Sequence, residues 1–459
     1  MGKLLFAAVF SVGSTAAWAQ NGSSAQNMVL LGHDDLQGRS SYQPVVRENR
    51  GRWIAYVGHH GGKKLNPLTG REEDNGTSIV DVTDPRKPRY LAHVPGEPGQ
   101  AEQGGAQMVR VCNGSELPKG DKSKVYMLRN FGNKAHEMWD VTTPEKPVRL
   151  AVIIEGLKDT HKSWWECDSG IGYLVSGLGD WRTRRMTQIF DLSDPVKPRF
   201  IRNFGLVGQQ PGATGPVPTE LHGLVSTGPK GNRLYFGYGT NKSGVMQIVD
   251  RQKLISGPAE PTPENLLAPQ VGRLDLNMNN GAHTALPVLG MQVAEFTKDK
   301  DQGKRDIVVV VDESLANECT EPRQFVWIAD VTDEKTPVVI STFNVAESPG
   351  NFCSRGGRFG SHSSNENQQP KYYGKYVFVA WFNAGIRAVD IRDPYHPREA
   401  GYYIPATTAK TDKRCVKDAA GAERCKIAIQ TNNLDVDDRG YLYAVDRADT
   451  GLHIVEFKP

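Results

Sequence analysis

The sequence predicts an all-β fold, a seven-bladed β-propeller of four-stranded blades, on three observations. A short motif recurs along the whole chain, and extended segments lie at regular intervals between its copies. Turn formers are abundant, with 48 glycines and 28 prolines, and no long stretch has helical periodicity. Because repetition at a long fixed period is typical of solenoids and propellers, the recurring motif decides the fold.

The motif is a β-branched or aromatic run that ends in a proline-containing turn. Its clearest copy is SIVDVTDPRKP at residues 78–88. Branched and aromatic residues suit a strand, whereas Pro presets the first corner of a turn and Asp or Thr bonds nearby amides. A second extended run follows each copy, so each unit is a hairpin. Further copies lie at residues 138–147, 189–198, 328–337 and 388–397, with divergent ones at 247–250 and 452–456.

Two more extended runs precede the motif in each repeat, which gives four strands per repeat. The seventh repeat ends at Pro459, directly after its third strand, and residues 28–33 (MVLLGH) have the pattern of the missing fourth strand. Strands from both termini would close the ring and remove its exposed edges. We therefore expect residues 28–459 to form one closed propeller domain.

The N-terminus predicts export. Residues 1–19 have the parts of a secretory signal peptide: Lys3, an apolar run over residues 4–17, and Ala-Trp-Ala at 17–19 as the cleavage site. Residues 20–27 are expected to be a flexible leader. The apolar run is too short to span a bilayer and no later run is long enough. The mature chain is therefore expected in the periplasm or outside the cell, without a membrane span.

The charge balance bears on the binding partners of the protein, and the cysteine content bears on its cellular compartment. The 55 basic and 52 acidic residues give a net charge of +3, and the basic residues are scattered, which argues against nucleic-acid binding. Six cysteines in an exported chain can form disulfides, although the sequence leaves their connectivity open. Cys415 and Cys425 bracket a local excursion, Cys319 and Cys353 lie in loops of neighbouring repeats, and Cys112 and Cys167 occupy one register of successive repeats.

The IVDVTDP pattern of residues 79–85 resembles that of the LVIVD-repeat family of exported bacterial β-propellers. The resemblance extends over nearly the whole mature chain and implies the propeller fold, but no settled reaction. The fourth copy departs from the family pattern, because RQKL at residues 251–254 replaces the turn. The outer edge of that blade is therefore not specified by the resemblance.

Four of the eleven histidines fall in one register, at the start of the first strand of four repeats. The first strand of a propeller blade lines the central channel, so these imidazoles are expected to meet near the axis. Neutral imidazole is a ligand for Fe, Cu, Zn and Ni. The alternative is that they only cap the channel by hydrogen bonds. The same register holds Ala106, Asn432 or Asn433, and Ser40 or Ser41; the candidate metal ligands are His161, His222, His283 and His362.

This arrangement is analogous in architecture to carotenoid-cleavage oxygenases and to selenium-binding-protein-like propellers, which hold metals with histidines. No sequence motif of either family is present here. We expect one transition metal ion, with Fe or Cu favoured and Zn possible.

The ends of the second strands are expected to surround the same mouth of the channel, which would suit a small, partly charged ligand. His60, Asp180 and Arg447 are candidates for positioning substrate or moving protons. Glu220, and less directly Glu366, could orient a ligand imidazole. Other candidates at the rim are His59, Arg129, Asn130, Trp181, Arg182, Asn241, Asp312, Glu313, Asn383 and Asp446.

Three functions remain open at the level of sequence. The favoured one is an exported metal-dependent oxidoreductase that acts on a small organic molecule. The second is a non-catalytic exported propeller that binds a glycan, a peptide or a protein. The third is a metal-dependent hydrolase with Zn at the same site.

Overall fold

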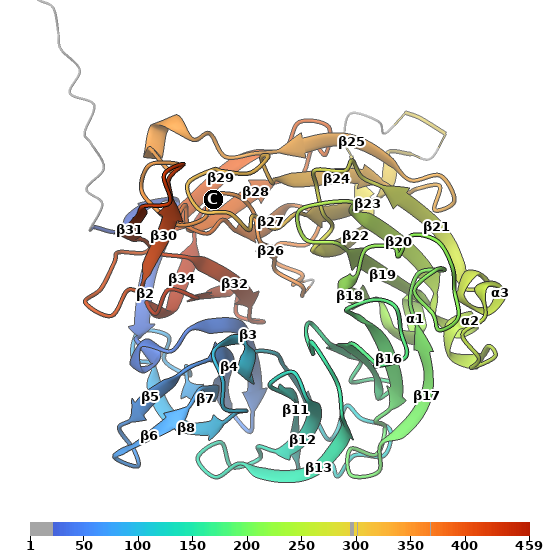
Figure 1. Ribbon diagram of the computed structural model, residues 1–459, viewed down its shortest axis with the longest axis horizontal. Helices are drawn as coiled ribbons and strands as arrows, with labels where there is room; N and C mark the ends of the chain where they lie inside the picture. The colour runs from blue at the N-terminus through green and yellow to red at the C-terminus, as the bar shows by residue number, and fades with distance from the viewer. Residues whose placement is uncertain (1–21, 294–297, 301, 368) are drawn as a thin grey trace, which may run out of the picture.

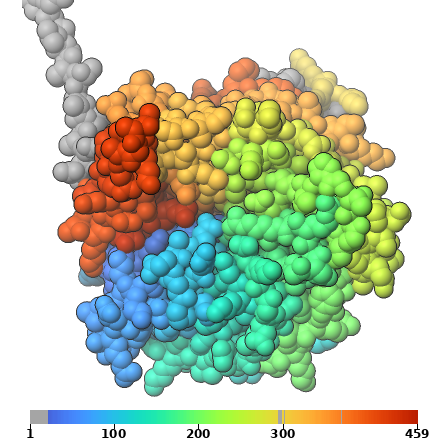
Figure 2. Space-filling model, in the orientation of Figure 1, coloured from blue at the N-terminus to red at the C-terminus, as the bar shows by residue number. Residues whose placement is uncertain are grey.

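The computed structural model describes residues 22–293, 298–300, 302–367 and 369–459, and it is a seven-bladed β-propeller (Figure 1). The blades follow one another around the ring in chain order, so that the last blade lies beside the first (Figure 2). The predicted fold class and blade number are confirmed. The predicted signal peptide lies outside the described residues.

Each blade is an antiparallel meander, and the first strands of neighbouring blades contact one another around the axis. Blade one consists of β3 (Ser41–Asn49), β4 (Arg52–Gly61), β7 (Gly76–Asp81) and β8 (Arg89–Pro95). Blade two consists of β10 (Val109–Asn113), β11 (Val125–Phe131), β12 (Ala135–Asp140) and β13 (Val148–Glu155). Blade three consists of β14 (Trp164–Trp165), β15 (Ile171–Ser176), β16 (Met186–Asp191) and β17 (Arg199–Phe204).

The second half of the ring repeats this order. Blade four consists of β18 (Leu221–Ser226), β19 (Arg233–Tyr238), β20 (Val245–Asp250) and β21 (Gln270–Asp275). Blade five consists of β22 (Thr284–Gln292), β23 (Lys304–Val311), β24 (Val326–Asp330) and β25 (Val338–Phe343). Blade six consists of β26 (Ser363–Ser364), β27 (Tyr376–Ala380), β28 (Ile386–Asp390) and β29 (Arg398–Ile404). Blade seven contains β32 (Thr431–Val436), β33 (Tyr441–Asp446) and β34 (Gly451–Phe457).

The recurring motif forms the turn between the third and fourth strands, as its residues require. At the end of the third strand, the Asp side chain of the motif accepts a hydrogen bond from the backbone amide two residues farther on. This bond stabilises the turn in place of a bond between two backbone groups. The pairs are Thr83 with Asp81 (3.0 Å), Thr142 with Asp140 (3.0 Å), Ser193 with Asp191 (2.9 Å), Thr332 with Asp330 (2.8 Å) and Arg392 with Asp390 (3.1 Å).

Both strands near the N-terminus join blades at the end of the chain. Strand β2 (Met28–Asp34) pairs antiparallel with β34 and completes blade seven, as predicted. Strand β1 (Ser24–Gln26) pairs with β29 as a fifth strand of blade six. The expected flexible leader over residues 20–27 is corrected to this extent, because the backbone of residues 24–26 completes the outer edge of that blade.

The divergent fourth motif folds differently but keeps its outer strand. Asp250 caps the helix α2 (Arg251–Ser256), its carboxylate accepting from the amide of Lys253 at 2.9 Å, and α3 (Pro263–Leu267) leads into β21. Two side hairpins complete the fold, with the single-turn helices η1 (Leu36–Gly38), α1 (Gly228–Gly231) and η3 (Ser348–Gly350). The hairpins are β5 (Lys63–Asn66) with β6 (Arg71–Asp74), and β30 (Lys413–Lys417) with β31 (Glu423–Ile427), while β9 (Ala101–Ala106) pairs with β4.

The hydrophobic core lies between neighbouring sheets, and three disulfides cross-link the chain around it. The bonds are Cys112–Cys167, Cys319–Cys353 and Cys415–Cys425, the three pairs that the spacing suggested. No helix among the described residues is long and apolar enough to cross a membrane.

Candidate metal centre

The four predicted histidines start the first strands of four consecutive blades. Three are placed by the same backbone hydrogen bond, in which the histidine amide donates to a carbonyl at the end of the second strand. The donors and acceptors are His161 and Val175 (2.8 Å), His283 and Val311 (2.8 Å), and His362 and Ala380 (3.0 Å). His222 lies in a β-bulge of β18, between two regular pairs with β19. All four side chains are buried in the central channel.

The four imidazoles contact one another in sequence. Ring centroids are 4.3 Å apart for His161 and His222, 3.6 Å for His222 and His283, and 4.3 Å for His283 and His362. The Nε2 atoms of His161 and His222 are 2.7 Å apart. Because transition metals bind nitrogen at about 2.0–2.2 Å, such neighbours are close enough to share an ion.

A carboxylate that was predicted only as part of the rim joins this cluster. Oε2 of Glu313 lies 3.9 Å from Nε2 of His222, and Oε1 lies 3.6 Å from Nε2 of His362. Ligand atoms of His222, His283 and Glu313 lie within 4.8 Å of one another. Among the described residues at the axis, the ligand atoms of this triad lie close enough together to bind one metal ion. This group is two histidines and a carboxylate, flanked by His161 and His362, and the four-histidine ligand set stays a prediction.

The hydrogen bonds around His283 determine which of its nitrogens is free. Lys162 Nζ donates to Thr284 Oγ1 and to Ser363 Oγ, each at 2.9 Å, and it pairs with Glu366 at 2.5 Å. The Thr284 hydroxyl can donate to Ser363, 3.3 Å away, while Ser363 donates to the Ser364 carbonyl. Thr284 Oγ1 then accepts from Nδ1 of His283 at 2.8 Å.

With its hydrogen on Nδ1, His283 presents an unprotonated Nε2. This atom is buried and has no hydrogen-bond partner among the described residues. His362 is held in the same tautomer, because its Nδ1 lies 2.6 Å from the Asn432 carbonyl, which can only accept. Such outer hydrogen bonds are the usual means of orienting a metal-ligating imidazole.

Burial keeps these imidazoles neutral. It lowers the pKa of His161, His222, His283 and His362 well below the usual range. Arg185 adds to the effect at His161 and His222, and Arg447 at His362. Burial also raises the pKa of Glu313, which Arg358 and Arg447 oppose. Neutral imidazoles with free lone pairs are the form that binds metals.

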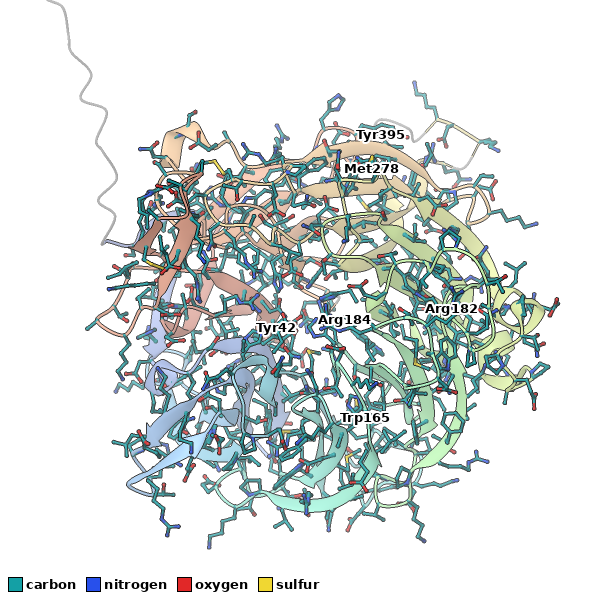
Figure 3. All side chains as sticks on the ribbon, in the orientation of Figure 1. Tyr42, Trp165, Arg182, Arg184, Met278 and Tyr395 are labelled. Carbon is teal, nitrogen blue, oxygen red and sulfur yellow. A yellow bond between two sulfur atoms is a disulfide. The ribbon has the colours of Figure 1, made fainter. Side chains whose placement is uncertain are left out.

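Tyr42 is a member of the site that the sequence did not indicate. Its hydroxyl lies 3.2 Å from Nε2 of His161, and its ring packs edge-on to His60 and His362, with centroids 5.1 and 5.9 Å away. Ser40 or Ser41 was expected at this position. A register shift between Ser41 and Pro44 brings Tyr42 to the axis instead. Figure 3 shows Tyr42 at the centre of the ring.

Two predicted rim residues do lie beside the cluster. Arg447 Nη1 is 3.9 Å from Oε1 of Glu313. His60 is buried, and its Nδ1 lies 3.4 Å from Oγ of Ser40, which itself donates to the Arg447 carbonyl. His60 must then donate through Nδ1, so its Nε2 is a free proton acceptor.

Most other rim candidates have structural contacts instead. His59 bonds Ser41 and Ser78, Arg129 pairs with Glu137, and Asn130 bonds the amide of Met108. Trp181 packs in the core of blades three and four, Asp180 is exposed, and Arg182 bonds loop carbonyls. Asn241 bonds Glu321, Asp312 bonds Asn280 and Trp327, Asn383 bonds two loop carbonyls, and Asp446 accepts from two amides.

The position predicted for Glu220 is corrected by the structure. Its carboxylate lies 4.0 Å from Arg184 and lines a surface groove, away from the His222 ring. The β-bulge at His222 breaks the alternation that would have put the two side chains on one face. Glu313, on the neighbouring blade, approaches His222 instead.

A family model matches a short segment of the chain. The LVIVD repeat model matches residues 371–404, which include strands β27 to β29 and one copy of the motif. The chain therefore contains an LVIVD repeat within its seven-bladed propeller. No curated protein sequence matches it.

Solved structures similar to this propeller are distant in sequence. Sqt1 of Saccharomyces cerevisiae shares 8% identity over 94% of this chain and 99% of its own, with a TM-score of 0.48. Sqt1 of Chaetomium thermophilum, solved with the N-terminus of ribosomal protein L10, shares 10% identity over 93% and 99%, with a TM-score of 0.48. Hydrazine synthase of Kuenenia stuttgartiensis shares 12% over 74% and 75%, with a TM-score of 0.41. None of the three informs the function of this chain.

Proposed function

We propose that this propeller is an exported metalloprotein that holds one transition metal ion on His222, His283 and Glu313 and acts as an oxidoreductase on a small organic molecule. The observation that carries the proposal is the buried, unpartnered Nε2 of His283, within 4.8 Å of ligand atoms of His222 and Glu313. A buried lone pair without a donor is costly unless something binds it. A metal ion would satisfy it.

The donor set is compatible with Fe, Cu and Zn, and the proposed oxidoreductase needs the redox-active Fe or Cu. Imidazole nitrogen suits Fe, Cu and Zn, and the triad has two imidazoles and one carboxylate, with His161 and His362 at hand as further ligands. When bound, the ion would supply Lewis-acid and redox chemistry. The three disulfides agree with an exported protein, because such bonds persist in oxidising compartments.

The residues of the chain itself would hold substrate and move protons. His60 offers an unprotonated, buried Nε2 beside Tyr42, which suits a proton acceptor. The Tyr42 hydroxyl, next to His161, is a donor at the same place. Arg447 and Arg358 lie against Glu313 and would position a charged group of the substrate.

Metal analysis of the purified mature protein tests the proposal. We expect close to one Fe or Cu ion per chain and an electron paramagnetic or optical signal that changes on reduction. His222→Ala and His283→Ala should remove most of the metal. His453→Ala is the control, because His453 lies on β34, away from the channel, and should leave the metal content unchanged.

The outcomes separate the alternatives. Zinc lost in both channel variants would favour metal-dependent hydrolysis at the same site. Negligible metal in the wild-type protein, after reconstitution with Fe, Cu and Zn, would refute the metal site and favour a non-catalytic binding propeller.

A further inference from the structure

Charged side chains form an alternating row above the histidine cluster. Arg185 lies 3.3 Å from Glu102, Arg447 lies 3.9 Å from both Glu102 and Glu313, and Arg358 lies 3.1 Å from Glu313. The row thus contains three guanidinium groups and two carboxylates. Its net charge is positive before any metal binds, and a divalent ion on Glu313 would make it more positive.

This excess charge is largely removed from water. The side chains of Arg185, Arg447 and Arg358 are 3%, 13% and 21% exposed. Burial lowers the pKa of Arg358 to about 10, helped by Arg447, which still leaves it charged at neutral pH. Buried charges in proteins are paired, because an unpaired charge loses its hydration without compensation. The excess positive charge of the row therefore favours binding of an anion.

One donor in the row is free to bind that anion. Nη1 of Arg447 is buried and has no hydrogen-bond partner among the described residues, since Glu313 is 3.9 Å away. A guanidinium with a free N–H binds a carboxylate or a similar oxyanion through a strong, charge-assisted hydrogen bond. The position beside Glu313 is also where a metal-bound group would lie.

We propose that the substrate is a small organic anion whose carboxylate or equivalent oxyanion binds Arg447 beside Glu313. This inference rests on the proposed metal site and adds the class of substrate to it. The charge of the anion balances the metal-loaded row, and its attachment to Arg447 fixes which end faces the metal. Neutral analogues would lack this contact.

A basic groove reaches the same mouth from the side of the ring. It has a volume of about 650 Å³ and is lined by four cationic and two anionic side chains: Arg182, Arg184, Lys242 and Arg273, and Glu220 and Asp275. Arg184 connects it to the row, because its guanidinium lies 3.4 Å from Glu102. Figure 3 shows Arg184 near the axis and Arg182 farther out. A positive groove steers anions towards the centre.

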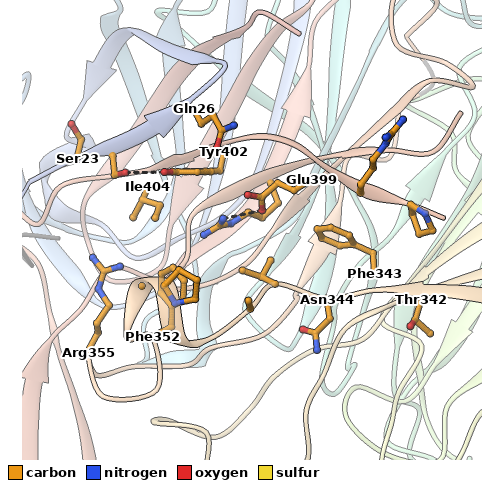
Figure 4. A pocket seen from close by; sticks show the side chains of 18 of the residues that line it. Ser23, Gln26, Thr342, Phe343, Asn344, Phe352, Arg355, Glu399, Tyr402 and Ile404 are labelled. Carbon is orange, nitrogen blue, oxygen red and sulfur yellow. Dashed lines mark hydrogen bonds and ion pairs between the residues drawn. The ribbon is translucent and has the colours of Figure 1, made fainter. Parts of the chain in front are cut away.

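A larger cavity elsewhere does not compete for this role. It has a volume of about 700 Å³ and lies at the outer side of blades five and six, between β25 and β29 (Figure 4). Its lining includes Phe352 and Tyr402, and Arg387 there is already paired with Glu399 at 2.9 Å. It has no connection to the four histidines.

Calorimetric titration of the metal-loaded protein with acetate and oxalate tests the inference, with acetamide as the neutral probe. We expect saturable binding of the anions and none of acetamide. Arg447→Met should weaken anion binding at least about tenfold, since a hydrogen bond to a charged group contributes about 1.5–3 kcal/mol. Arg149→Met is the matched control, because Arg149 pairs with Glu137 on an outer strand and is 55% exposed.

Metal content is measured on the same samples, so the two proposals can fail separately. Absence of metal would refute the metal site, whereas a metal-loaded protein that binds no anion would refute this inference. Equal anion affinity in Arg447→Met and Arg149→Met would also refute it. If Arg447→Met does not fold or loses metal, Arg185→Met decides, because Arg185 contacts Glu102 and not Glu313. Unchanged anion binding in that variant would overturn the inference.

Discussion

Thr284 Oγ1 lies 2.8 Å from Nδ1 of the adjacent His283 and accepts its hydrogen. The hydrogen of the Thr284 hydroxyl goes to Ser363, 3.3 Å away, whose own hydrogen is donated to the Ser364 carbonyl, and Nε2 of His283 is left bare at the axis. A threonine one residue along the strand thus determines the chemical form of the candidate ligand.

Thr284→Val keeps the shape of the side chain but removes this acceptor. We expect metal affinity to fall about tenfold to a hundredfold, the usual cost of losing an outer hydrogen bond to a ligating histidine. Competition with a chelator measures the change. Thr431→Val is the control, because the Thr431 hydroxyl is buried at the start of β32 and has no hydrogen-bond partner in the part of the chain that the structure describes. A metal affinity that is equal in both variants would contradict the assigned tautomer.

Glu313→Gln tests the carboxylate that the structure adds to the cluster. The variant removes the negative charge of the side chain but keeps its volume. Losing an outer hydrogen bond to a ligand lowers metal affinity about tenfold to a hundredfold, and losing this ligand should lower it by more. Glu220→Gln should retain the wild-type metal content, because Glu220 faces Arg184 in the groove. Metal loss in Glu220→Gln alone would restore the role that the sequence predicted for it.

The sequence predicted the propeller well because the motif carries its own turn chemistry. In five copies the Asp at the end of the third strand needs no distant partner to turn the chain, so these copies indicate hairpins directly. Closure by β2 was also predictable, since residues 28–33 have the same pattern as the other outer strands.

The site was less predictable wherever strand pairing is irregular. The bulge at His222 turned Glu220 away, and the register shift after Ser41 brought Tyr42 to the axis. Both irregularities lie on first strands, whereas the recurring motif lies on the third strand and the turn after it. The motif therefore gives no indication of them. Glu313 comes from the end of β23 and meets His222 only through the curvature of the closed ring, which a linear pattern does not describe.

Lys162 and Glu366 form a buried ion pair of 2.5 Å below the histidines, with Arg110 on the other carboxylate oxygen. Lys162→Met should destabilise the fold by about 3–5 kcal/mol, because it leaves Glu366 only partly compensated. Adding Glu366→Gln should cost less than the sum of the single changes, by about 0.5–3 kcal/mol. Urea unfolding of the four proteins checks the cycle, and additive losses would contradict the coupling.

The disulfides should contribute according to the loops they close. Cys415–Cys425 spans 10 residues within one hairpin, whereas Cys112–Cys167 spans 55 and joins two blades. Chain entropy predicts losses of about 3 and about 4 kcal/mol when each pair is replaced by serine. Chemical unfolding measures both. A larger loss for the hairpin pair would indicate that this hairpin has a role in packing over the channel mouth.

The last prediction concerns pH and His136, a buried histidine on β12. Burial lowers its pKa to about 3 in the folded chain, below the ordinary value of 6.5. Above pH 6.5 the imidazole is neutral in both states and costs no stability by titration. Between pH 6.5 and 3 the unfolded chain binds a proton that the folded chain does not, so stability falls by about 1.4 kcal/mol per pH unit for this group.

His136→Leu should therefore have a free energy of unfolding within about 1 kcal/mol of the wild type near pH 7.5. As the pH falls, the variant should become progressively more stable than the wild type. Asp435 and Asp446, whose pKa values burial raises to about 7 and about 6, oppose this slope in both proteins and cancel in the difference. Urea unfolding of the two proteins at pH 7.5, 6.5 and 5.5 measures it. A difference that does not change with pH would show that His136 titrates as an exposed histidine does and that its side chain reaches water.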